Sequence, residues 1–123
     1  MIDPNFILLY VDSPTASAGF YADLLGKPPV ESSATFAMFA LENGVMLGLW
    51  SRRTVAPAAT ASPGAGELAF ALPDNIAVDR AFADWRGRGL TIAQEPTNLD
   101  FGHTFMALDP DGHRLRVFAP AAS

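Results

Sequence analysis

The order of strand and helix signals in the first half of the chain recurs in the second half. The apolar run 6–11 predicts a buried strand, and Ser13 and Pro14 follow it as a helix cap and a first-turn proline. The apolar run 67–72 is likewise followed by a turn and cap at Asp74. Two copies of one small module therefore constrain this chain more than any single motif does.

The spacing of matched residues supports the repeat. Asp74 lies 62 positions after Asp12, and Phe82 in the second helical stripe lies 62 positions after Phe20 in the first. In the strands that end each half, the offset is 68, which relates Leu115 to Leu47 and Phe118 to Trp50. Chance matching of hydrophobic residues is the alternative, but the shared cap, stripe and order favour duplication of a strand–helix–three-strand module.

The remaining strands and the linker complete the two modules. The first helix is predicted to end at Gly26, and strands are expected at 30–33, 35–41 and 45–50, then at 91–95, 104–108 and 115–118. The segment 51–65 is rich in Ala, Pro, Gly, Thr and Ser and has no hydrophobic period, so it predicts a linker. We therefore expect one domain, 1–123, with modules 5–50 and 66–118.

Composition excludes several classes of function. The chain has no cysteine, which rules out disulfides, thiolate metal sites and thiol nucleophiles. Its net charge of −5 disfavours nucleic acid as a partner. The run 6–11 is far too short to span a membrane, and the flanking Asp3 and Asp12 have the wrong charge for a signal peptide. We expect a soluble, cytoplasmic protein with no membrane partner.

Two sequence segments resemble the vicinal oxygen chelate superfamily of glyoxalases, bleomycin-resistance proteins and dioxygenases. "YVDSPTASAGFYADLLGKPP" is similar to its first strand, cap and helix, and "FGHTFMALDPDGHRLRVFAP" is similar to its last hairpin. The segment "FALENGVMLGLWS" further resembles the small phenazine-antibiotic resistance proteins of this superfamily. The resemblance implies an α+β fold in which two βαβββ modules form a cup-shaped curled sheet, and a homodimer that often completes the cup.

The resemblance also locates four positions at which enzymes of the superfamily bind a divalent metal. These positions hold Asn5, Gly48, Glu67 and Arg116. Such a set does not suit a cation, because Gly48 has no donor and Arg116 is a permanent charge of the same sign. We therefore expect no metal and no cofactor. Glu67 and Arg116 are predicted to form an ion pair facing across the cup, or else to point to solvent; the pair could present its guanidinium to a ligand carboxylate.

Trp50 is the strongest candidate for contact with a ligand. It ends a predicted strand, and alternation puts it on the same face as Met46 and Gly48. We expect Gly48 to leave empty volume beside the indole, which would make Trp50 a stacking platform for a flat ligand. The alternative is a core tryptophan packed on the other module.

Further residues are expected at the site with less specific signals. Phe105 is predicted to supply apolar wall, although strand alternation allows only about half of such residues to face the cup. His103 is predicted either to reach the cup or to lie on the surface. Ser51 is predicted to gate the mouth, or to belong to a plain charged loop with Arg52 and Arg53.

These observations predict metal-free binding and sequestration of a small planar aromatic compound, as in antibiotic resistance of the phenazine or bleomycin type. We expect a binding protein rather than an enzyme, with no catalytic residues. Two alternatives stay open. One is a metal-dependent lyase, isomerase or dioxygenase with displaced ligands, and the other is a degenerate scaffold with a regulatory role. Metal analysis distinguishes the predicted binding protein from the first alternative, and a thermal-shift screen with planar aromatics distinguishes it from the second.

Overall fold

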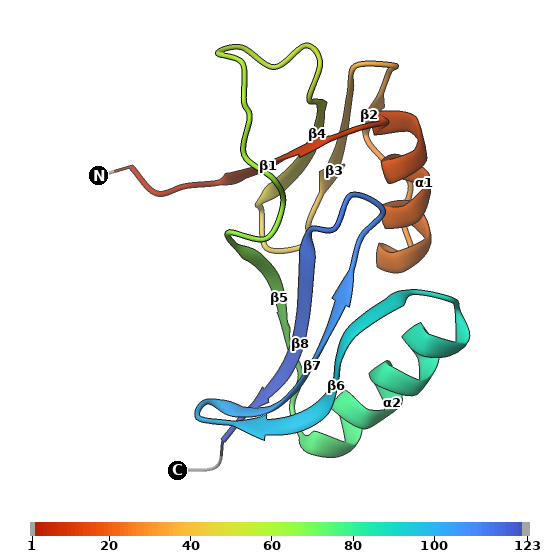
Figure 1. The fold of residues 1–123 in the computed structure, drawn as a ribbon, viewed down its shortest axis with the longest axis vertical. Coiled ribbons are helices and arrows are strands. Elements are labelled where there is room, and N and C mark those ends of the chain that lie inside the picture. Colours follow the sequence, from red (N-terminus) through yellow and green to blue (C-terminus); the bar gives the residue numbers. More distant parts are fainter. Residues whose placement is uncertain (1, 122–123) are drawn as a thin grey trace. The chain divides into compact units, whose positions relative to one another are not determined.

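The computed structural model describes residues 2–121 and divides the chain into two compact units, with the boundary between Ala61 and Ser62. Each unit has one strand, one helix and three further strands, with the strands forming a four-stranded sheet (Figure 1). The predicted α+β fold of two βαβββ modules is therefore confirmed.

Unit 1 contains a mixed sheet with one helix. Its elements are β1 (Phe6–Val11), α1 (Pro14–Leu25), β2 (Glu31–Ser32), β3 (Phe36–Ala40) and β4 (Met46–Ser51). The strand order is β1-β4-β3-β2, in which β1 runs parallel to β4 and the other pairs are antiparallel. The parallel pair needs a long connection, and the helix and two strands between β1 and β4 provide it.

The ends of α1 follow the predicted capping chemistry. The Ser13 hydroxyl accepts a hydrogen bond from the Ala16 N–H at 3.2 Å, and Pro14 occupies the first turn. At the other end, Gly26 has a φ of 70°, and its N–H donates to the Ala22 carbonyl at 3.0 Å. These local signals fix where the helix begins and ends.

One face of the unit 1 sheet packs against α1. The fully buried side chains on this face include Val11, Phe39 and Leu49, with Tyr21 contributed by the helix. Strand alternation places another set of side chains on the opposite face. We call that surface the helix-free face of unit 1: Phe6, Leu8, Tyr10, Phe36, Met38, Met46, Gly48 and Trp50.

Unit 2 repeats the arrangement. Its elements are β5 (Glu67–Ala71), α2 (Asn75–Gly87), β6 (Thr91–Leu99), β7 (Gly102–Leu108) and β8 (Arg114–Pro120), in the order β5-β8-β7-β6. The Asp74 carboxylate accepts a hydrogen bond from the Ala77 N–H at 2.8 Å, as its predicted capping role requires. Trp85 of α2 packs edge-on against Phe70 and Phe105, which joins the helix to one face of the sheet.

Three strands of unit 2 extend beyond their predicted bounds, and β8 does so at both ends, spanning Arg114–Pro120 rather than 115–118. β6 continues to Leu99 rather than ending at residue 95, because register shifts after Ile92 and Gln94 absorb extra residues while pairing with β7 resumes. β7 begins at Gly102 rather than at residue 104. A side chain at Gly102 would lie 1.9 Å from the Ala119 carbonyl oxygen, and the φ is 146°, so only glycine permits this close strand pairing.

The linker begins one residue later than predicted. Ser51 is the last residue of β4, and its N–H donates to the Thr35 carbonyl at 2.9 Å. The next residues form a turn in which the Val55 N–H donates to the Ser51 carbonyl, and Val55 is buried. Residues 55–66 contain no helix or strand.

No helix within residues 2–121 is long and apolar enough to cross a membrane.

Candidate ligand-binding site

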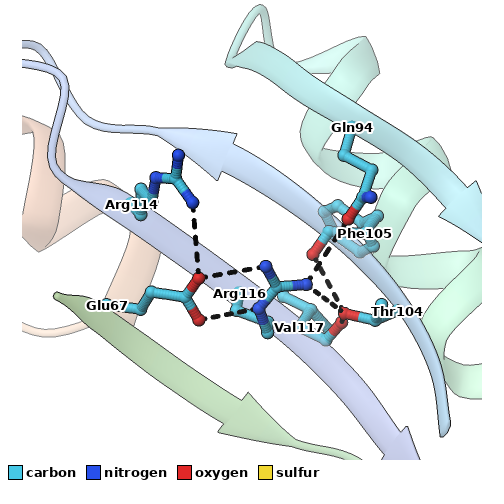
Figure 2. A network of polar contacts seen from close by, with 7 residues as sticks. All are labelled: Glu67, Gln94, Thr104, Phe105, Arg114, Arg116 and Val117. Atoms are coloured by element: carbon cyan, nitrogen blue, oxygen red, sulfur yellow. Dashed lines mark hydrogen bonds and ion pairs between the residues drawn. The ribbon is translucent and has the colours of Figure 1, made fainter. Parts of the chain in front are cut away.

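Arg116 and Glu67 form a two-pronged ion pair on neighbouring strands of unit 2. The Arg116 Nε donates to Glu67 Oε2 at 2.7 Å, and its Nη2 donates to Oε1 at 3.0 Å (Figure 2). The predicted ion pair is therefore confirmed, but the prediction that it faces across the cup was wrong. Arg116 lies opposite Ala69 in the β5–β8 ladder, so the two residues of the pair are on adjacent strands of one sheet. Parallel guanidinium–carboxylate bonds of this kind hold both planes in a fixed orientation.

The Nη1 group of Arg116 is engaged by two further side chains. Its Nη1 donates to Thr104 Oγ1 at 3.1 Å and approaches Gln94 Oε1 at 3.4 Å (Figure 2). Thr104 is itself held by donating to the Val117 carbonyl at 2.8 Å. The guanidinium carbon lies 5.6 Å from the Phe101 ring centroid. Arg116 is thus a fixed, mostly buried cation, with a side chain 15% exposed.

The ion pair keeps Glu67 ionised. Hydrogen bonding from Arg116 is the main cause that lowers the pKa of Glu67, and the positive charges of Arg116 and Arg114 act in the same direction. Partial burial opposes them but is the weaker influence overall, since the net shift is downward. Arg114 Nη1 lies 3.8 Å from Glu67 Oε1, so a second cation adjoins the pair (Figure 2).

The four positions that the resemblance identifies with metal ligands do not fit a divalent cation. Both oxygens of Glu67 accept hydrogen bonds from Arg116, which is itself positively charged. Gly48 has no side-chain donor, and Asn5 is an exposed residue whose carbonyl accepts the Met46 N–H. Within residues 2–121 there is also no cluster of three or more His, Cys, Asp or Glu side chains that could hold a metal.

Trp50 lies on the helix-free face of unit 1, as alternation predicted. It pairs with Tyr10 on one side and Phe36 on the other, and its ring contacts the Tyr10 ring edge-on with centroids 6.4 Å apart. Its side chain is half-buried. Within its own unit, Trp50 is therefore separate from the core under α1.

The expected empty volume beside Trp50 is absent. A Cβ on Gly48 would lie 2.6 Å from Leu8 Cδ2 and 3.0 Å from Phe36 Cζ, so these two side chains already fill the space above the glycine. The prediction was wrong because it considered only β4, whereas the neighbouring strands contribute the covering side chains. Gly48 serves to let Leu8 and Phe36 close over the centre of the sheet.

Phe105 and His103 lie on the opposite face of the unit 2 sheet from Arg116. Phe105 is fully buried and contacts Phe82 and Trp85 of α2. His103 shares this helix-covered face, where its Nδ1 lies 2.8 Å from Asn98 Oδ1 and its Nε2 2.7 Å from Asp79 Oδ1. His103 thus links β6 to α2 through these two contacts.

Ser51 is buried rather than placed at a mouth. Its hydroxyl accepts a hydrogen bond from the Arg53 N–H at 3.3 Å, so it shapes the turn after β4. Arg53 in turn pairs with Asp12 at the end of β1. These contacts give Ser51 a structural part in closing unit 1.

A pocket that was not predicted from the sequence lies on the Arg116 face of unit 2. It has a volume of about 430 Å³, and its lining includes Ala93, Gln94, Met106, Leu108, Arg114 and Arg116. Arg114 was not among the predicted site residues, although alternation from Arg116 places it on the same face. The volume lies within the range of small-molecule sites.

Comparison with known proteins agrees with this architecture. The family model of the Glyoxalase/Bleomycin resistance protein/Dioxygenase superfamily matches residues 4–117, and the chain belongs to this superfamily. The phenazine antibiotic resistance protein EhpR of Enterobacter agglomerans is 32% identical over 119 residues, covering 94% of this chain and 91% of that protein.

Solved structures share the fold along the whole chain. The solution structure of protein ATC0852 from Agrobacterium tumefaciens is 53% identical, with a TM-score of 0.90 and coverage of 99% of this chain and all of that one. A glyoxalase/bleomycin resistance protein/dioxygenase from Nocardioides is 24% identical, with a TM-score of 0.83 over all of this chain and 86% of that one. The second likeness concerns the fold alone.

Proposed function

We propose that this protein binds and sequesters a small planar aromatic compound without a metal, as an antibiotic-resistance protein of the phenazine type. The 32% identity to a phenazine antibiotic resistance protein supports the ligand class. The superfamily also includes metal enzymes, so membership alone does not distinguish a binder from a catalyst. The distinction depends on the side chains at the candidate site.

The observation that carries the proposal is the exposed aromatic surface on the helix-free face of unit 1. Phe6 is 46% exposed and Tyr10 is 38% exposed. Tyr10 lies beside the half-buried Trp50, and Phe6 lies beside Met46 of the same strand. Large apolar side chains exposed together on one sheet face typically mark a binding surface. Aromatic rings there offer a flat ligand both apolar burial and offset stacking.

The metal-free part of the proposal is supported by the Glu67–Arg116 pair. A guanidinium occupies both carboxylate oxygens that a metal would need, and the pair is reinforced by Thr104 and Gln94. A cation would have to break this arrangement and then sit beside a fixed positive charge. The arrangement therefore suits a binding protein better than a metal-dependent enzyme.

Isothermal titration calorimetry with phenazine tests the proposal directly. We expect saturable binding by protein that has been dialysed against a chelator, with unaltered affinity after addition of Zn²⁺ or Mn²⁺. Lack of saturable binding up to the solubility limit of phenazine would reject the ligand class. Binding that requires a metal would reject the metal-free mechanism.

A further inference from the structure

Two methionines lie on the helix-free face of unit 1, the surface that the proposed function assigns to the aromatic ligand. The chain has four methionines, of which Met38, Met46 and Met106 lie within the described residues. Met38 and Met46 are half-buried, whereas Met106 in unit 2 is only 3% exposed. The two thioethers of unit 1 are therefore open to a small solute, and that of Met106 is shielded.

The strand register places these two side chains close to each other and to Trp50. Met38 pairs with Gly48 across the β3–β4 ladder. Met46 and Trp50 lie two residues to either side of Gly48 on β4. Each of the two is therefore a diagonal neighbour of Met38 on the same face of the sheet. A change of polarity at either sulfur thus alters the surface that surrounds the indole.

A thioether differs from the other apolar side chains of this face in its reactivity toward peroxides. A lone pair of the sulfur attacks one oxygen of hydrogen peroxide, the O–O bond breaks, and the products are methionine sulfoxide and water. The sulfur is oxidised and the peroxide is reduced by one electron pair. Methionine sulfoxide reductases reverse the step with a thiol reductant, so the change from an apolar to a polar side chain is reversible.

We propose that Met38 and Met46 make the ligand-binding face sensitive to peroxide, so that their oxidation to sulfoxides releases the aromatic compound and their reduction restores binding. This inference rests on the proposed function, because it concerns the same face of unit 1. A sulfoxide oxygen covered by a flat apolar ligand loses hydrogen bonds to water and gains none in return. We expect the affinity for phenazine to fall about tenfold, which corresponds to about 1.4 kcal/mol.

The first measurement locates the oxidation in the absence of ligand. The folded protein is treated with increasing concentrations of hydrogen peroxide, and peptide mass spectrometry reports each methionine separately. Sulfoxide should form at Met38 and Met46 at concentrations that leave Met106 unmodified. Oxidation of Met106 as fast as that of the other two in folded protein would overturn the proposal.

The second measurement determines whether oxidation weakens binding. Calorimetric titrations with phenazine compare untreated protein, peroxide-treated protein, and treated protein that has then been incubated with the two reductases that act on the two sulfoxide epimers. The affinity should fall on oxidation and return on reduction. Thermal melts of each sample establish that it is folded.

Matched variants assign the effect to the two sulfurs of unit 1. The double variant Met38→Leu, Met46→Leu keeps apolar side chains of similar volume but has no thioether on the face. Its affinity for phenazine should be the same before and after peroxide. Met106→Leu removes the shielded thioether of unit 2 instead, and this variant should lose affinity on oxidation by the same factor as the wild-type protein.

The outcomes separate this inference from the proposed function. An affinity for phenazine that oxidation of Met38 and Met46 leaves unchanged, or a loss that persists in the double variant, would overturn the inference while the proposed function stands. Absence of phenazine binding by the untreated protein would overturn the proposed function and this inference with it. A reversible loss of affinity that is absent from the double variant supports both.

Discussion

Arg116 donates two hydrogen bonds to Glu67 from the adjacent strand of unit 2, and each residue thereby satisfies the other's charge. The superfamily resemblance associates both positions with metal ligands. Because one of the two positions holds arginine, the two side chains form an ion pair with each other instead of offering two donors to a metal. Arg116 therefore determines the chemistry of both positions.

The first prediction concerns metal content. Purified without a metal-affinity step, the protein should contain no stoichiometric Ni, Zn, Mn or Fe, because Arg116 occupies the Glu67 oxygens. Elemental analysis by mass spectrometry provides the measurement. About one metal per chain, lost in Glu67→Ala, would contradict the prediction and favour a metal enzyme.

The second prediction concerns pH. The pKa of Glu67 is lowered in the folded protein, so its ion pair stabilises the fold above the ordinary carboxyl pKa of about 4.3, and this stabilisation is lost as the pH falls through the lowered value. Glu67→Gln should therefore lower the free energy of unfolding by about 1 kcal/mol at pH 7. Urea titrations should show the difference shrinking in acid. A difference that grows in acid would refute the assignment.

The third prediction concerns Gly48. Gly48→Ala should destabilise the protein by about 1 kcal/mol at most, because the new methyl group would lie 2.6 Å from Leu8 Cδ2 and 3.0 Å from Phe36 Cζ, and the exposed Leu8 side chain can turn aside. Gly19→Ala is the matched control, since its position in α1 is open and exposed. That change should stabilise the helix by about 0.5–1 kcal/mol. Chemical denaturation of both variants measures the two opposite effects.

The fold was largely predictable because its boundaries depend on local chemistry. Ser13, Pro14 and Gly26 define the ends of α1 through hydrogen bonds and backbone angles that involve only nearby residues. Asp74 does the same for the start of α2. The repeat then supplied the strand order along the chain without any knowledge of tertiary contacts.

The site was less predictable because it depends on register between strands. Five residues separate Leu108 from Arg114, and the Asp109 N–H donates to the His113 carbonyl to close this turn. With a turn one residue longer or shorter, the side chains of β7 that now share a face with Arg116 would lie on the opposite face. Phe105 would then line the pocket instead of packing under α2. The covering of Gly48 by Leu8 and Phe36 likewise comes from strands distant in sequence.

The fourth prediction concerns assembly. β1 forms an edge of its sheet, and its apolar side chains are exposed, with Phe6 at 46% and Leu8 at 44%. Covering such a surface in a symmetric homodimer removes apolar area from water. Sedimentation velocity at micromolar concentration should therefore show a dimer, and Leu8→Lys should shift it toward monomer. A wild-type protein that sediments only as a monomer would contradict the expectation.

The final prediction concerns Trp50, on which the aromatic-binding proposal depends. Trp50→Ala should remove on the order of 100 Å² of ligand contact, which at roughly 25 cal/mol per Å² amounts to about 2.5 kcal/mol. The affinity for phenazine should then fall roughly fifty- to a hundredfold. Trp50→Phe keeps an aromatic face and should lose much less.

Stability distinguishes this role from a purely structural one. Trp50 is half-buried on the helix-free face, whereas Trp85 is packed against Phe70 and Phe105. Because both tryptophans contribute to the fluorescence, affinity is better measured by calorimetry. A stacking role predicts a large loss of affinity with a modest change in melting temperature. A core role predicts the reverse, with strong loss of stability and unchanged affinity per folded molecule. Measuring both quantities on Trp50→Ala and Trp50→Phe therefore decides whether the indole contacts the ligand or supports the fold.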